Sequence, residues 1–142
     1  MSDTGYSAFA TTLDKTNRVL KQIEEAYGWP KVRRNQSYAA LRAVLHALRD
    51  RLTVEEAAQL AAQLPMLIRG LYYEGWVPAR VPVKMNREEF IGRVRQDFGF
   101  DVVGGTEQLI RTVLEAVRHH VTEGEWDDIR SGMPRELAGV LP

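Results

Sequence analysis

The sequence contains two similar halves, and this internal repeat restricts the fold more than any other feature. Equivalent apolar positions near the start of the halves are Val19, Ile23 and Tyr27 in one and Phe90, Val94 and Phe98 in the other. Equivalent positions farther along are Leu41, Val44, Leu45, Leu48, Leu52, Leu60, Leu64 and Ile68, matched by Ile110, Val113, Leu114, Val117, Val121, Ile129, Met133 and Leu137. We therefore predict two units of one architecture, residues 16–75 and 87–142, joined by an extended, proline-containing linker at residues 76–86.

Within each unit the apolar residues recur at the spacing of an α-helix. The first pattern runs from Leu13 to Tyr27 and stops at Gly28, which is typical of a helix end. A second helix, from Gln36 to Arg51, has leucines and valines on one arc and alanines on another, so we expect it to be buried on two sides. No stretch alternates apolar and polar residues as a strand does. We predict an all-α protein of about eight helices, four per unit, packed as one bundle-like domain of residues 1–142.

Capping boxes mark several helix starts. In such a box, a first side chain and a glutamate three residues later each bond to the other's backbone amide. The boxes are Thr53–Glu56, Asn86–Glu89 and Thr122–Glu125. Proline suits the first turn of a helix, so Pro65 and Pro134 indicate two further starts. Because the boxes at Thr53 and Thr122 and the two prolines occupy equivalent repeat positions, the same helix order is expected in both units.

Three segments are predicted to lie outside helices. Residues 76–86 contain two prolines among valines, which indicates an extended connector on the surface. Residues 31–35 indicate a polar, basic loop. Residues 101–105 indicate a glycine-containing loop, with Thr106 as the cap of the next helix.

The composition excludes several classes of function. The chain of 142 residues suffices for one domain, and its 19 basic side chains balance 19 acidic ones. No overall charge therefore steers it toward nucleic acid or an anionic membrane. Without cysteine, disulfide bonds, thiolate catalysis and cysteine-ligated zinc are excluded. The first residues do not resemble a secretory signal and charges interrupt every apolar run, so we expect a soluble, cytoplasmic protein that does not enter a membrane.

A family resemblance covers nearly the whole chain. Residues 41–76, LRAVLHALRDRLTVEEAAQLAAQLPMLIRGLYYEGW, resemble the core of the bacterial family called domain of unknown function 2267. The linker and the half with FIGRVRQDFGF and MPRELAGVL are also similar to that family, and AQLPMLIRGLYYEGW is the most specific part. The resemblance implies an all-helical bacterial protein of one or two such units. It implies no activity, substrate or catalytic residue.

Two histidine–carboxylate pairs form a candidate metal site. His46 and Asp50 lie one turn apart on the second helix, and Glu115 and His119 stand at the equivalent repeat positions. If the two helices crossed, these side chains would offer a metal ion two imidazoles and two carboxylates. We favour an ordinary surface pair on each helix, because His46 and Asp50 lie away from the leucines. We therefore expect both to be exposed and no cofactor to be needed.

An aromatic segment of the first unit is a candidate for an interaction or a ligand. Arg69, Tyr72, Tyr73 and Trp76 surround the helix that begins at Pro65. Arginine near tyrosines can bind a carboxylate or phosphate, and an exposed tryptophan can anchor a protein partner. The alternative, which we favour, is that the rings close the core where the linker crosses and that Arg69 bonds to a helix terminus.

A set of basic residues is the candidate for contact with nucleic acid. It comprises Lys31, Arg33, Arg34, Arg42 and Arg49, which would form one face of residues 31–49. The neutral net charge and the lack of a recognisable turn between a scaffold helix and a recognition helix favour a solvated basic face instead.

No pattern in the sequence indicates catalysis. The paired acids are adjacent in sequence, so their side chains diverge on a helix, and no nucleophile stands with a base. We predict a non-catalytic module that binds an unknown protein or itself. The alternatives are nucleic-acid binding through residues 31–49, and small-ligand or metal binding between the two halves.

Overall fold

The computed structural model describes residues 6–142, apart from the side chain of Glu136. Its α-helices (α) and short 3₁₀ helices (η) are, in order, α1 (Ser7–Tyr27), η1 (Lys31–Arg33), α2 (Arg34–Arg51), α3 (Val54–Ala61), α4 (Met66–Tyr73), η2 (Pro78–Arg80), α5 (Arg87–Asp97), α6 (Gly105–Arg118), α7 (Glu123–Gly132) and α8 (Arg135–Ala138). No strand occurs in this part of the chain, so the all-α prediction is confirmed. None of these helices is both long and apolar enough to cross a lipid bilayer.

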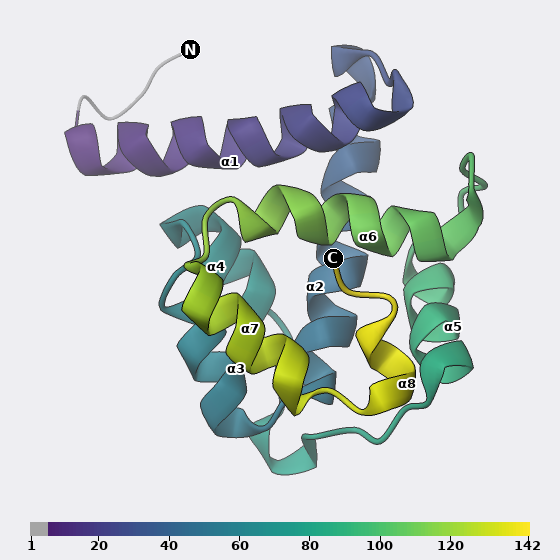
Figure 1. Ribbon diagram of the computed structural model, residues 1–142. Helices are drawn as coiled ribbons and strands as arrows, with labels where there is room; N and C mark the ends of the chain where they lie inside the picture. The colour runs from purple at the N-terminus through teal and green to yellow at the C-terminus, as the bar shows by residue number, and fades with distance from the viewer. Residues whose placement is uncertain (1–5) are drawn as a thin grey trace.

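Helix α2 is the centre of the fold and contacts α1, α4, α5 and α6 (Figure 1). Both of its sides are buried, as the sequence predicted: Leu45 and Leu48 on one arc, and Ala43 and Ala47 on the other, are at most 2% exposed. Helix α1 lies across one end of the molecule and packs against α2, α4 and α6. The first turns of α1 extend beyond the other helices in this view (Figure 1).

Two of the predicted capping boxes are complete. Thr53 Oγ1 accepts a hydrogen bond from the Glu56 amide at 3.1 Å, and the Glu56 carboxylate accepts one from the Thr53 amide at 3.0 Å. The box at residues 86–89 has the same pair of bonds, at 2.8 and 2.9 Å. Each box therefore satisfies amides that have no partner within the first turn of their helix.

The third capping box forms only in part. Thr122 Oγ1 accepts a bond from the Glu125 amide at 3.2 Å, as predicted. The Thr122 amide, however, donates to the side-chain oxygen of Gln63 at 2.7 Å. Gln63 lies in the turn between α3 and α4, and α3 packs against α7. A side chain from the first half thus takes the place of the glutamate at the start of α7.

The prediction of a loop at residues 31–35 is wrong. Residues 31–33 form η1, and α2 begins at Arg34. The Arg34 guanidinium makes two hydrogen bonds to the Glu24 carboxylate of α1, at 3.0 and 2.9 Å. This tertiary contact holds the turn against α1 and favours regular structure, which the local sequence does not indicate.

The predicted cap of α6 is also wrong. Gly104, and not Thr106, is the residue before the helix, and α6 begins at Gly105. Gly104 has a φ of 85°, a left-handed conformation that glycine adopts without the steric cost of a side chain. The turn from the glycine loop into α6 is therefore made by glycine itself.

The linker between the halves is held against α2. Within residues 76–86, η2 provides one short helical turn and the Val81–Pro82 peptide bond is cis. The Val83 amide donates to the Asp50 carbonyl at 2.7 Å. The linker is thus mostly non-helical, as predicted, and is joined to the C-terminal end of α2.

Candidate binding cleft

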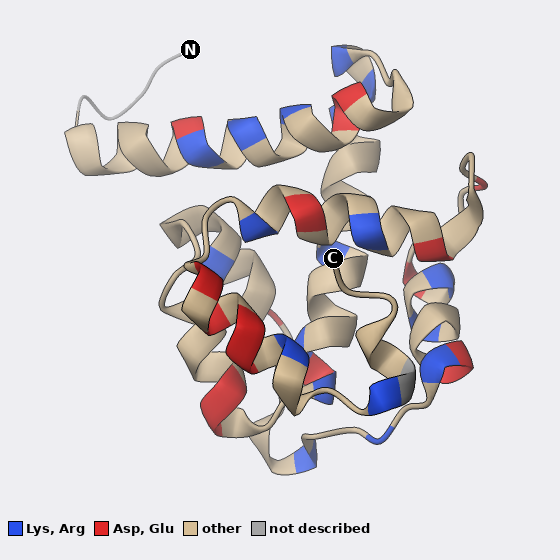
Figure 2. Ribbon diagram, in the orientation of Figure 1, with Lys and Arg blue, Asp and Glu red and all other residues tan. Residues whose placement is uncertain are grey.

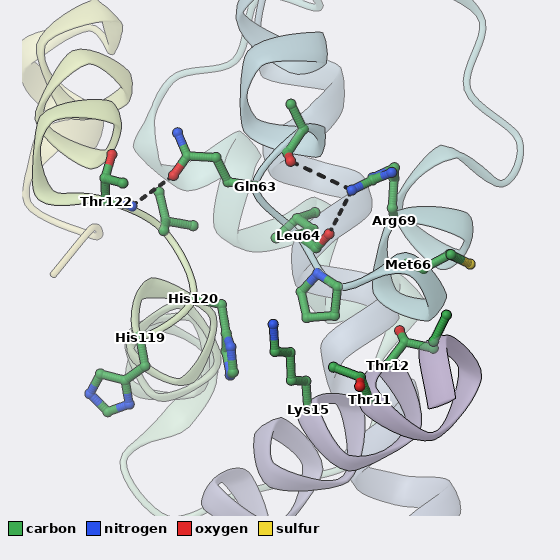
Figure 3. Close-up of a pocket in the computed structure, with 14 residues that line it drawn as sticks. Thr11, Thr12, Lys15, Gln63, Leu64, Met66, Arg69, His119, His120 and Thr122 are labelled. Carbon is green, nitrogen blue, oxygen red and sulfur yellow. Dashed lines mark hydrogen bonds between the residues drawn. The ribbon is translucent and has the colours of Figure 1, made fainter. Parts of the chain in front are cut away.

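A cleft of about 680 Å³ opens between α1, the α3–α4 turn and the α6–α7 turn (Figure 3). Lys15 lies on the α1 wall, Pro65 and Arg69 lie on the second wall, and His119 and His120 lie on the third. These three segments are distant in sequence. Their convergence brings together basic groups that no local pattern associates.

Thr12 holds two of the walls together. It is buried, and its Oγ1 accepts a hydrogen bond from the Leu67 amide, in the first turn of α4, at 3.0 Å. Amides of a first turn have no partner within their own helix, and Pro65 before α4 provides no capping side chain. Thr12 therefore supplies the missing acceptor from another helix and fixes α1 beside the cleft.

Arg69 closes the end of α3. Its Nε donates to the Ala61 carbonyl at 2.8 Å and its Nη2 to the Leu64 carbonyl at 3.0 Å. The last carbonyls of a helix lack intrahelical partners and interact favourably with a cation. This is the helix-terminus contact that the sequence favoured. Nη1 of Arg69 makes no hydrogen bond to residues 6–142, and Arg69 lines the cleft.

The cleft is basic. Lys15, Arg69, His119 and His120 line it, and no described lining residue is Asp or Glu. His120 is half-buried and lies beside Lys15 (Figure 3). Burial lowers the pKa of the His120 imidazole, and nearby Lys15, His119 and Arg18 lower it further. His120 thus lies among basic side chains of α1 and of the α6–α7 turn.

The aromatic candidates lie outside this cleft. Tyr72 is buried, its hydroxyl donates to the Ala57 carbonyl at 2.9 Å, and burial raises its pKa. The Tyr73 ring contacts those of Tyr72 and Trp76, with centre-to-centre distances of 5.3 and 5.2 Å. Tyr73 and Trp76 are half-buried against the core. Tyr72 is therefore a core residue, and Arg69 lines the cleft without these rings.

The prediction that His46 and Asp50 are exposed is wrong. They are 6% and 8% exposed, because α4 and α5 cover that side of α2. His46 Nε2 lies 2.8 Å from the Leu71 carbonyl oxygen, and burial lowers its pKa. A neutral imidazole with its proton on Nε2 donates this bond. Asp50 accepts hydrogen bonds from Arg49 Nε at 2.9 Å and from Arg93.

The second histidine–carboxylate pair lies apart from the first. Glu115 of α6 and His119, the residue after α6, are partly exposed, and their Oε2 and Nε2 atoms are separated by 3.6 Å. His119 Nδ1 lies 2.9 Å from the side-chain oxygen of Gln22 on α1. Among residues 6–142, no group of three or more His, Asp or Glu side chains gathers to hold a metal ion. The two candidate pairs therefore do not converge on one site.

Arg49 does not belong to a basic surface, contrary to the prediction. It is 4% exposed, and its Nη1 donates to the Tyr72 and Glu74 carbonyls at 2.9 and 2.8 Å. Arginine retains its charge when buried, and the Asp50 carboxylate and these carbonyls compensate it. Its role is to hold the end of α4 against α2.

The other basic candidates differ in their partners. Arg34 is paired with Glu24, and Arg42 forms an exposed ion pair with a glutamate at the end of α4, at 3.3 Å. Lys31 and Arg33 are exposed. Basic and acidic residues are interspersed along α1, α5 and α6 (Figure 2). The set is therefore not one continuous basic face.

The sequence matches the family described as Uncharacterized conserved protein (DUF2267) over residues 16–140. The chain belongs to this family. The match extends from within α1 to the end of α8, and it confirms the resemblance found in the sequence. No curated protein is detectably similar to the chain.

An apolar groove lies on another side of α1. It has a volume of about 310 Å³, lies between α1, α2 and α4, and is lined in part by Leu20, Tyr38 and Leu67. At about 100° per residue, Phe9 and Leu13 lie within about 20° of Leu20 around the helix. They are 44% and 39% exposed. The apolar stripe of α1 thus continues past the groove toward the N-terminal end of the helix.

Several residues of the cleft and of the groove were not predicted as site residues, although Arg69 and His119 of the cleft were candidates. Lys15, His120 and Thr12 have no local signal, because the cleft assembles from segments distant in sequence. The groove had a signal in the helical spacing of Phe9, Leu13 and Leu20. The spacing does not show that the core buries only Leu20, at one end of this stripe, and leaves Phe9 and Leu13 exposed.

Proposed function

We propose that this protein is a non-catalytic helical module that self-associates through its apolar α1 surface. We define this surface as Phe9 and Leu13 of α1, Tyr38 of α2 and Leu67 of α4. The observation that carries the proposal is their exposure, which is 39–47% for these large side chains; Tyr38 and Leu67 line the groove, and Phe9 and Leu13 lie on the face of α1 that enters it. Contiguous exposed apolar surface on a folded protein commonly marks an interaction site.

The proposed partner is a second copy of the chain, because one chain supplies both complementary parts. The groove beside Leu20 is concave, and the exposed stripe at Phe9 and Leu13 continues along α1 toward its N-terminal end. In a twofold dimer each stripe enters the groove of the other copy, and both contacts form at once. The net charge of zero imposes no overall repulsion between copies.

Sedimentation equilibrium across a concentration series tests this proposal. We expect the wild-type mass to rise from that of one chain to that of two. Leu13→Glu and Leu67→Glu bring a carboxylate into the apolar contact, so each is expected to weaken association at least about tenfold. Val103→Glu is the matched control, because Val103 is 85% exposed in the loop before α6. A wild-type monomer at every concentration, or equal weakening by all three substitutions, would contradict the proposal.

We also infer that residues 1–142 form one domain of two four-helix units. Matching local geometry supports the inference: Thr53 and Thr122 cap equivalent helices, and Pro65 and Pro134 have φ/ψ values of −54°/148° and −55°/147°. The contact between α3 and α7 joins the units. A bacterial origin and a cytoplasmic location stay predictions, the latter supported by the lack of cysteine.

The geometry favours the other candidate functions less. Nucleic-acid binding would draw on Arg49 and Arg34, but the first is buried and the second is paired with Glu24. Metal binding would require the histidine–carboxylate pairs of α2 and α6 to meet, and they lie apart. Ligand binding between the halves has a specific cleft to support it, and that cleft is a separate site from the apolar α1 surface.

A further inference from the structure

We propose that the cleft between α1, the α3–α4 turn and the α6–α7 turn binds a phosphorylated small molecule, with its phosphate between Lys15 and His120. This site is independent of self-association. Lys15 faces the cleft, whereas Thr16 and Leu20 of the same helix line the apolar groove. Figure 3 shows the Lys15 ammonium and the His120 ring side by side.

The charge of the cleft selects an anion. Lys15 offers an ammonium group with three donors, and His120 offers a ring N–H. Arg69, on the opposite wall, binds carbonyls through Nε and Nη2, and its Nη1 makes no hydrogen bond to residues 6–142. Because no carboxylate is among the described lining residues, no side chain of the cleft competes with an anion for these donors.

Two positive charges near His120 have no acidic partner in the described part of the chain. Lys15 and Arg18 of α1 form no ion pair there, whereas His119, the residue after α6, lies 3.6 Å from the Glu115 carboxylate. A phosphate dianion would compensate two such groups at once, and charge-assisted hydrogen bonds to phosphate are among the strongest in proteins. A neutral ligand would compensate none of them. The electrostatics therefore favour phosphate over an uncharged molecule.

The size of the cleft indicates that the ligand is more than an inorganic ion. Its volume of about 680 Å³ lies within the range of small-molecule sites, roughly 300–1,000 Å³. Leu64, Pro65 and Met66 provide an apolar strip beside the basic groups. Met66 is 52% exposed, and methionine adapts its shape to a bound group. An organic portion attached to the phosphate would lie along this strip.

A nuclear magnetic resonance titration of the 142-residue chain tests the proposal with phenyl phosphate, inorganic phosphate and phenol. We expect the amide signals of Lys15, His120 and Val121 to shift saturably with phenyl phosphate. Inorganic phosphate should bind more weakly, because it lacks the organic portion, and phenol should not bind. All titrations are made at one ionic strength, since surface charge effects change with salt.

Matched substitutions locate the site. Lys15→Gln and His120→Gln each remove a charged or ring donor and are expected to weaken phenyl phosphate binding about tenfold or more. Lys21→Gln is the control, because Lys21 is an exposed lysine of the same helix that lies outside the cleft. Equal weakening by Lys15→Gln and Lys21→Gln would overturn the proposal. Equal affinity for phenol and phenyl phosphate would also overturn it.

The Leu13→Glu variant separates this site from self-association. Phenyl phosphate should bind this variant with wild-type affinity, because no cleft residue is changed. Loss of binding in the variant would overturn a site contained within one chain. If the chain stays monomeric but binds phenyl phosphate, the ligand site is supported although the proposed self-association is contradicted.

Discussion

At the scale of single residues, buried charge explains how α1 and α2 are joined. Glu24 accepts hydrogen bonds from Arg34 Nε and Nη2 at 3.0 and 2.9 Å, and from Ser37 Oγ at 2.6 Å. The Arg34 guanidinium lowers the pKa of Glu24, burial opposes this, and Ser37 contributes further to the lowering. The folded protein therefore stabilises the charged form of this carboxylate.

We predict that Glu24 contributes to the loss of stability in acid. Because its pKa is lower in the folded chain, the stabilisation is complete above the ordinary value of 4.5 and is lost as the pH falls through the folded value. Glu24→Gln should flatten this part of the pH dependence and cost about 1–3 kcal/mol of unfolding free energy at neutral pH. Urea unfolding across a pH series measures both effects. Glu25→Gln, a substitution of the exposed neighbouring residue, is the control. If the unfolding free energy of Glu24→Gln falls in acid as steeply as that of the wild type, the prediction is refuted.

At the scale of elements, the C-terminal end of α2 holds the linker and α5. The Asp50 carboxylate bonds to Arg49 of its own helix and to Arg93 of α5, while its carbonyl accepts the Val83 amide of the linker. Arg49 extends the same network to the end of α4. One buried ion network thus fixes the start of the second half against the central helix.

We predict that Asp50→Asn destabilises the protein by about 3–5 kcal/mol, because it leaves the buried Arg49 guanidinium without its counter-charge. Urea unfolding monitored by circular dichroism measures the change. Asp97→Asn, an exposed substitution at the end of α5, is the control and should cost less than about 0.5 kcal/mol. Similar costs for the two substitutions would show that the Asp50 network does not support the fold.

At the scale of the whole molecule, the two halves share contacts at several places. Helix α6 packs against α1 and α2, α3 packs against α7, and Gln63 bonds to the Thr122 amide at 2.7 Å. A half of this size has a marginal core of its own, and burial of apolar surface between the halves adds about 25 cal/mol per Å². The halves should therefore depend on each other for stability.

We predict one cooperative unfolding transition for the chain. With Trp29→Phe and Trp76→Phe in place, fluorescence comes from Trp126, the tryptophan of the second half, whereas circular dichroism reports all helices. The two urea midpoints in this variant should coincide, as two-state unfolding requires. An earlier or later transition of Trp126 would indicate that the halves unfold separately.

Local sequence predicted most helix ends because caps act locally. Gly28 ends α1 with a φ of 68°, and the boxes at Thr53 and Asn86 form as their residue types require. The exposure of His46 and Asp50 was predicted wrongly, because the helical spacing identifies a leucine arc but not which helices cover the other arc. Arg69 was placed correctly at a helix terminus, whereas its position in a basic cleft depends on α1 and α6 and has no local signal.

The sequence by itself determined the helical class, the family and the local signals at most helix ends, since spacing, caps, glycine and proline act over a few residues. The tertiary structure decided which charges are buried and which groups converge. Asp50 and Arg49 are buried because α4 and α5 pack over that side of α2. Lys15 lies beside His120 because α1 packs next to the α3–α4 and α6–α7 turns. Burial and convergence are properties of packed elements, so no spacing within one helix specifies them.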